Sequence, residues 1–150
     1  HTHPVGIEGA VAQAVAAHHA LKETFELGPV LSDLDRLLES DRFRRELEAF
    51  EECVSRRDDV AAVRQLGNGV SADRSVLTAV YCFVTGDDFE NTVRRAIRMG
   101  GDTDTIAAMA GALAGARYGV TDVPETWVEV EGRDRLLALA DRFVSRLSDR

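Results

Sequence analysis

Oxygen-bearing side chains gather in one short stretch, which runs Gly100-Gly101-Asp102-Thr103-Asp104-Thr105 and precedes a run of small residues. Asp102 falls at the N-terminal cap of a predicted helix, and Asp104 and Thr105 fall in its first turn, so their oxygen atoms can converge on one point. Hard oxygen ligands of this kind suit Mg²⁺, Mn²⁺ or Ca²⁺. The two glycines let the backbone turn sharply and approach a ligand closely. One hypothesis for this stretch is therefore a divalent cation site.

A second interpretation needs no ligand. Asp102 could act only as a helix cap, and Asp104 only as a favourable charge at the positive end of the helix dipole. The spacing alone leaves both interpretations open. A phosphotransfer loop of the D-x-D-x-T type is excluded, because that loop follows a buried strand, whereas residues 94–99 have the pattern of an amphipathic helix.

Two other segments could meet a ligand. The turn Gly67-Asn68-Gly69-Val70-Ser71 precedes a predicted helix, so its backbone amides could face an anion or a nucleotide edge, or it could be only a C-cap followed by an N-cap. The start His1-Thr2-His3-Pro4 could bind a metal ion or form a ligand-contacting loop before the first helix. His18 and His19 are adjacent on a helix, and we interpret them as surface or boundary residues.

Helical periodicity dominates the chain, and no stretch alternates with period two between turn residues, so the prediction is an all-α domain. Gly28-Pro29 is expected to end the first helix, and the segment rich in Val76, Val80 and Phe83 is expected to be a core helix. The helices are expected over residues 5–26, after Ser32, after Asp41, from Asp58 or Asp59 to before Gly67, from Ser71 or Asp73 through Val84, through Met99, over 102–118, in a short segment around Trp127, and over 133–147.

Composition places the chain among small soluble domains. Its 150 residues carry 18 basic and 26 acidic side chains, a formal charge of −8 that is interspersed along the sequence. Binding to nucleic acid or to an anionic membrane surface is therefore not expected. Cys53 and Cys82 lie far apart and are predicted to be reduced structural thiols. No apolar run approaches the roughly 20 residues that span a bilayer, so the expected compartment is the cytoplasm.

With these segments identified, the chain resembles the C-terminal portion of the ADP-ribosylglycohydrolase family, which includes the dinitrogenase-reductase-activating glycohydrolase. The resemblance covers most of the chain and is nearest to the branch that removes ADP-ribose from serine and from poly(ADP-ribose). It rests on residues 1–10, 66–70, 75–83, 100–111, 118–119 and 123–127.

The resemblance implies a compact multi-helix bundle that holds two Mg²⁺ or Mn²⁺ ions beside the ribose of an ADP-ribosyl group. Asp102, Asp104 and Thr105 are the implied metal ligands, with Asp104 bridging the ions. His3 is expected near the phosphate or the distal ribose, and the turn at Gly69 and Val70 near the adenine. The implied reaction is metal-dependent hydrolysis of an N- or O-glycosidic bond to ADP-ribose, on ADP-ribose-modified protein or a related substrate.

The chain also departs from the family. The remaining metal ligands, a Thr-Asp-Asp run, and the acidic catalytic residue belong to an N-terminal portion that these residues do not contain. Thr85-Gly86-Asp87-Asp88 is not that run, because a glycine interrupts it and it lies between two predicted helices. We therefore expect residues 1–150 to be the C-terminal part of one domain, completed by an N-terminal segment or a second chain. The alternative is a non-catalytic member that binds ADP-ribose or, like a lens crystallin, has a structural role.

Overall fold

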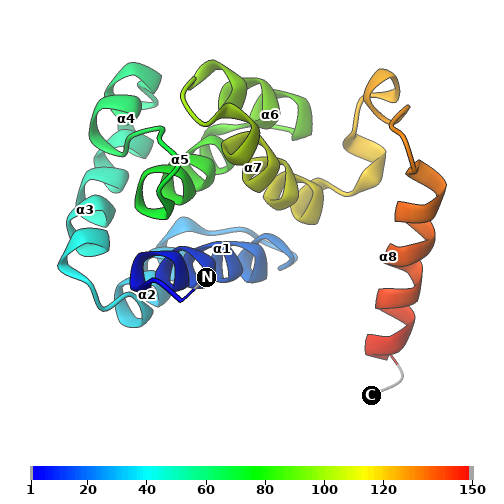
Figure 1. The fold of residues 1–150 in the computed structure, drawn as a ribbon, viewed down its shortest axis with the longest axis horizontal. Helices are drawn as coiled ribbons and strands as arrows, with labels where there is room; N and C mark the ends of the chain where they lie inside the picture. Colours follow the sequence, from blue (N-terminus) through cyan, green and yellow to red (C-terminus); the bar gives the residue numbers. More distant parts are fainter. Residues whose placement is uncertain (1, 149–150) are drawn as a thin grey trace.

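The structure is a computed structural model that describes residues 2–148, and helices joined by short turns make up nearly all of it (Figure 1). No strand occurs within that range, which confirms the all-α prediction. The helices are α1 (Pro4–Ala20), α2 (Leu27–Leu37), α3 (Asp41–Arg56), α4 (Asp59–Gln65), α5 (Ala72–Thr85), α6 (Phe89–Arg98), α7 (Thr103–Tyr118) and α8 (Arg133–Ser148), with short 3-10 turns at Val120–Asp122 and Glu125–Trp127.

Helix α5 is the centre of the bundle, as its apolar composition predicts. It packs against α1, α3, α6 and α7, and Leu77, Val80 and Tyr81 are fully buried. Figure 1 shows α5 in green between the flanking helices. Burial of these side chains is the main stabilising contribution that this helix makes. Cys53 and Cys82 are buried free thiols, so that prediction is confirmed.

Helix α7 packs closely on α6 because its sequence is rich in small residues. A Cβ atom added to Gly111 would lie 3.4 Å from a methyl group of Val93 on α6. The helix begins where the sequence predicts, directly after Asp102, and Gly119 ends it with a φ of 78°. The small residues therefore fix the position of the acidic N-terminus of α7 relative to the rest of the bundle.

The first helix is shorter than predicted, because it ends at Ala20 and not at residue 26. Arg117 of α7 donates hydrogen bonds to the backbone carbonyls of Lys22 and Glu23, at 2.8 and 3.1 Å, so these carbonyls have partners without a helix. The ring of Phe25 turns inward and packs edge-on against Phe83, with centroids 5.0 Å apart. Tertiary contacts therefore replace the last turns of the predicted helix.

Two predicted helix starts were also wrong. Gly28 and Pro29 lie inside the first turn of α2, where a proline costs no helical hydrogen bond, so Ser32 is an interior residue and not a cap. The cap of α3 is Ser40 and not Asp41, because the Ser40 Oγ accepts a hydrogen bond from the Phe43 amide.

His19 is buried, contrary to the interpretation that it is a surface or boundary residue. Only 3% of it is exposed, and its Nε2 lies 2.9 Å from the Oδ2 of Asp33. This contact joins the end of α1 to α2, whereas the adjacent His18 is exposed as expected.

Helix α8 stands beside the bundle and not within it, and Figure 1 shows it in red on the far side of the segment that follows α7. Its apolar side chains are largely exposed, and Phe143 has an exposed fraction of 68%. Among the described helices, none has the length and hydrophobicity to cross a membrane.

Candidate functional site

The glycine pair before α7 adopts the backbone conformation that the sequence predicts. Gly100 and Gly101 have φ angles of 68° and 65°, in the left-handed region that favours glycine. Gly101 also lies against another loop, since a Cβ atom added to it would fall 2.0 Å from the backbone oxygen of Asn68. A larger residue at position 101 would therefore push the two loops apart.

Asn68 connects the two glycine-containing loops. Its backbone oxygen accepts a 2.8 Å hydrogen bond from the Asp102 amide, and its side-chain Nδ2 donates to the Met99 carbonyl at 2.8 Å. The neighbouring Gly67 carbonyl accepts a 2.6 Å hydrogen bond from the Thr78 hydroxyl of α5. In the sequence the two loops are separate motifs, and this role of Asn68 could not be predicted from it. The available signal was only its position between two glycines opposite another glycine pair.

Three oxygen-bearing side chains at the start of α7 have no hydrogen-bond or ion-pair partner within residues 2–148. They are the carboxylates of Asp102 and Asp104 and the hydroxyl of Thr105. Asp102 occupies the N-cap position of α7, yet its side chain makes no capping hydrogen bond. Capping therefore does not account for this carboxylate. Asp104 and Thr105 are exposed in the first turn, and Asp102 is partly buried.

This donor set matches a hard divalent cation in type but not in number. Two carboxylates and one hydroxyl fall short of the about six oxygen ligands that Mg²⁺ prefers. Within the described part of the chain, no three His, Cys, Asp or Glu side chains are grouped as a metal site. Asp88 does not add to the set, because its side chain caps α6 through the Asn91 amide at 2.6 Å.

A cavity of about 580 Å³ lies where α1, α5 and α7 meet, and we call it the α1–α7 cavity. Its lining includes His3, Val70 and Thr105, so three distant segments that the sequence singled out meet there. Gly69, Asp102 and Asp104 do not line it. Gly69 and Asp104 are each adjacent in sequence to a lining residue, Val70 and Thr105, whereas Asp102 lies three positions before Thr105. The other position proposed at the N-terminus, His1, lies outside the described residues.

Polar side chains complete the lining. Gln13 of α1 donates a 3.1 Å hydrogen bond to the Met109 carbonyl of α7, and its buried Oε1 has no partner among the described residues. Ser71 and Ser75 line the α5 side. Val70 is 84% exposed at the turn before α5, so the lining combines a free apolar side chain with several hydrogen-bonding groups. Such a mixture is typical of small-molecule sites.

The sequence matches the family described as ADP-ribosylglycohydrolase over residues 1–150. The chain belongs to the ADP-ribosylglycohydrolase family. It is 36% identical to the ADP-ribosylhydrolase ARH3 of Bos taurus, in an alignment that covers 93% of this chain and 47% of the relative. It is 37% identical to the ARH3 of Homo sapiens, over 85% of this chain and 44% of that protein.

The sequence also matches a relative with a different name. The ADP-ribosyl-[dinitrogen reductase] glycohydrolase of Rhodospirillum rubrum is 49% identical over 40% of this chain and 24% of its own length. The chain spans about half the length of the ARH3 relatives that it matches. The family assignment thus confirms the resemblance, while the roles of individual site residues stay predictions.

Proposed function

We propose that the protein hydrolyses the glycosidic bond between ADP-ribose and an acceptor, and that the α1–α7 cavity holds part of the ADP-ribosyl group. The observation that carries this proposal is the meeting of His3, Val70 and Thr105 at one cavity, beside an acidic helix end whose carboxylates have no described partner. A structural member of the family would have no need of such an arrangement. Membership of the family and the names of its relatives support the same reaction.

In this proposal each part of the cavity contacts a different part of the ligand. The exposed Val70 side chain offers an apolar surface to the adenine, and Gly69 allows the base to approach the backbone. His3 is the N-cap residue of α1 and also lines the cavity, so its ring could donate to a phosphate or to the distal ribose. The nucleotide would then extend from the turn before α5 towards α1.

Asp102, Asp104 and Thr105 would be the residues of this chain that hold two Mg²⁺ or Mn²⁺ ions. Bound metal supplies orientation of the ribose hydroxyls and of a water, and stabilises developing charge. The hydrogen bond that Asn68 donates to Met99 and the one that it accepts from the Asp102 amide brace both flanks of the Gly100-Gly101 turn, and so support the three ligand residues that follow. A rigid support of this kind is what a precise metal site requires.

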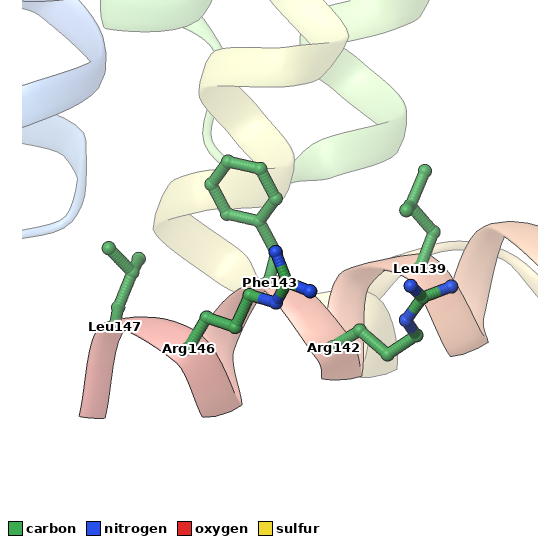
Figure 2. Close-up of a pocket in the computed structure, with 5 residues that line it drawn as sticks. All are labelled: Leu139, Arg142, Phe143, Arg146 and Leu147. Atoms are coloured by element: carbon green, nitrogen blue, oxygen red, sulfur yellow. The ribbon is translucent and has the colours of Figure 1, made fainter. Parts of the chain in front are cut away.

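We further propose that an N-terminal segment or a second chain completes the site and covers α8. The shortage of metal ligands described above supports this, and so does the span of the chain relative to the ARH3 proteins. Figure 2 shows Leu139, Phe143 and Leu147 projecting from the same side of α8, where they line an open groove with Arg142 and Arg146. A contiguous apolar face of this kind is typical of a surface that another segment or another protein covers.

The proposed function is tested by single-residue variants of the intact protein acting on an ADP-ribosylated protein or peptide in the presence of Mg²⁺. Asp104→Ala is expected to abolish metal binding and to lower turnover by at least about a hundredfold, as loss of a group that stabilises transition-state charge does. Asp134→Ala is the matched control, because its carboxylate is 97% exposed on α8. Full turnover of the Asp104 variant would contradict the proposed site.

Gly69→Val separates substrate binding from chemistry. The nearest atom to an added Cβ there is 3.9 Å away, on Arg74, so the variant is expected to fold. If Gly69 admits the nucleotide to the backbone, this variant should raise KM while leaving metal binding intact. An unchanged KM would remove Gly69 from the site. ADP-ribose binding without any hydrolysis would instead favour the non-catalytic alternative.

A further inference from the structure

A second cavity, of about 450 Å³, lies between α3 and α5 and has an arginine-rich lining; we call it the arginine cavity. The residues that line it are Arg42, Arg45, Glu46, Ala49, Gln65 and Arg74. Three guanidinium groups at one cavity are notable in a chain whose formal charge is −8. Neither the proposed hydrolysis nor the resemblance to the family uses them.

The arginines differ in how far their charge is already neutralised. Arg42 forms an ion pair with Asp73, which is fully buried and also accepts a hydrogen bond from the Ser71 hydroxyl. Arg74 reaches Asp73 only at 3.8 Å, through its Nε. Arg45 has no ion-pair or hydrogen-bond partner within residues 2–148. At least one full positive charge at this cavity is therefore available to a ligand.

The stem of Arg74 packs against the glycine turn. A Cβ atom added to Gly67 would lie 2.5 Å from the Cδ of Arg74, so the arginine stem crosses the space that a side chain at position 67 would fill. A guanidinium whose stem packs against a neighbouring loop loses less conformational entropy on binding an anion than one on a free side chain. Its planar fork can donate two parallel hydrogen bonds to a phosphate or a carboxylate.

Glu46 is the one acidic residue of the lining, and it is 9% exposed with a buried Oε2 that has no hydrogen-bond partner among the described residues. Burial, followed by the negative charge of Asp73, raises the pKa of Glu46 to about 7. In its protonated form Glu46 opposes no anion, and it becomes a hydrogen-bond donor. The buried acid therefore complements an oxyanion that accepts hydrogen bonds.

We propose that the arginine cavity binds phosphate, or a phosphate group of a larger ligand, through the guanidinium groups of Arg45 and Arg74. Arg42 also lines the α1–α7 cavity, so the two cavities adjoin at this residue. The bound group can consequently be free phosphate or a phosphate carried by the ligand of the adjoining cavity. Both sources present the same tetrahedral oxyanion.

The test is a calorimetric titration of the intact protein with inorganic phosphate at constant ionic strength. Arg45→Gln is expected to weaken phosphate binding about tenfold, the effect of removing a hydrogen bond between charged groups. Arg44→Gln is the matched control: it removes the same charge from the adjacent position, but Arg44 lines a different cavity with Leu31 and Glu48. Equal weakening by both variants, or no binding of phosphate to the unmodified protein at millimolar concentration, would overturn the proposal.

A pH series with sulfate tests the part played by Glu46, because sulfate keeps its double negative charge between pH 6 and 8. The charged groups that face Glu46 are Arg42 and Arg45 from α3 and Asp73 and Arg74 from α5. Since the pKa of Glu46 is about 7, sulfate should bind up to about tenfold more tightly at pH 6 than at pH 8. Glu46→Gln should bind sulfate equally at both pH values. A pH dependence that persists in this variant would contradict the role of Glu46.

A last titration distinguishes the two sources of the phosphate group. If saturating ADP-ribose displaces inorganic phosphate, the cavity receives a phosphate of that ligand; if phosphate still binds, the cavity takes free phosphate. This titration with ADP-ribose rests on the proposed function. The phosphate titration of the Arg45→Gln and Arg44→Gln variants does not. Failure of ADP-ribose to bind would therefore contradict the proposed function and leave the phosphate site standing.

Discussion

At the scale of single residues, two side-chain features control the geometry of the candidate site. Gly101 lets the backbone pass within contact distance of Asn68, and Asn68 hydrogen-bonds to both sides of the glycine turn. The need for glycine at positions 100 and 101 could be predicted from the motif. The contact with Asn68 could not be predicted, because it joins two loops that are far apart in the sequence. Asn68, whose Nδ2 donates to the Met99 carbonyl, lies 31 positions before Met99.

The two glycines give a direct test of this geometry. Gly101→Ala is expected to lower the free energy of unfolding by about 2–3 kcal/mol, because it combines a positive φ with a collision against the Asn68 backbone. Gly100→Ala has a similar φ but its Cβ would lie 3.7 Å from the nearest atom, so about 1 kcal/mol is expected. Urea denaturation measures both. Equal losses in the two variants would show that the contact with Asn68 contributes nothing.

At the scale of secondary-structure elements, the buried acid between α3 and α5 makes stability depend on pH. Burial and the charge of Asp73 raise the pKa of Glu46 from its ordinary value of 4.5 to about 7. The folded state therefore holds this proton more tightly than the unfolded chain does. The contribution of protonated Glu46 to the free energy of unfolding is fully present below pH 4.5 and is lost as the pH rises through 7.

Glu46→Gln isolates that contribution. Between pH 4.5 and 8, the free energy of unfolding of the unmodified protein is expected to fall by up to about 3 kcal/mol relative to that of the variant. Each unit of difference in pKa between the folded and unfolded states corresponds to about 1.4 kcal/mol. The stability of the variant relative to the unmodified protein should consequently rise between pH 4.5 and pH 8. The measurement is urea denaturation in a buffer that contains neither phosphate nor sulfate. A constant difference between the two proteins across this range would contradict the pKa assigned to Glu46.

Most elements could be predicted from the sequence, and the boundaries that were misplaced have identifiable physical causes. The core helix α5 and the starts of α4 and α7 follow from local patterns of apolar residues and caps. The end of α1 does not, because Arg117 and Phe83 stabilise a non-helical segment from distant positions. The starts of α2 and α3 were misplaced for local reasons, because Pro29 is tolerated in a first turn and Ser40 supplies the cap one residue before Asp41.

At the scale of the whole molecule, α8 indicates how the fold is completed. Its Phe143 is 68% exposed beside a bundle that is otherwise well packed (Figures 1 and 2). Phe143→Ala is expected to change the stability of the 150-residue chain by less than about 0.5 kcal/mol, as exposed substitutions do. In a protein that contains the proposed completing segment, the same change should cost about 3 kcal/mol, because the ring would be buried. Equal small effects in both proteins would show that nothing covers this face.

The central claim is that the acidic end of α7 and the α1–α7 cavity form one metal-dependent ADP-ribose site. The most direct measurement is a calorimetric titration with ADP-ribose, with Mg²⁺ and then with EDTA. It uses the intact protein that contains the proposed completing segment, in its unmodified form and as Asp104→Asn. Mg²⁺ is expected to tighten binding by at least about tenfold, because metal bound at Asp104 adds charge-assisted contacts to the ligand. The variant should lose that dependence. Equal binding of ADP-ribose with Mg²⁺ and with EDTA would contradict the account.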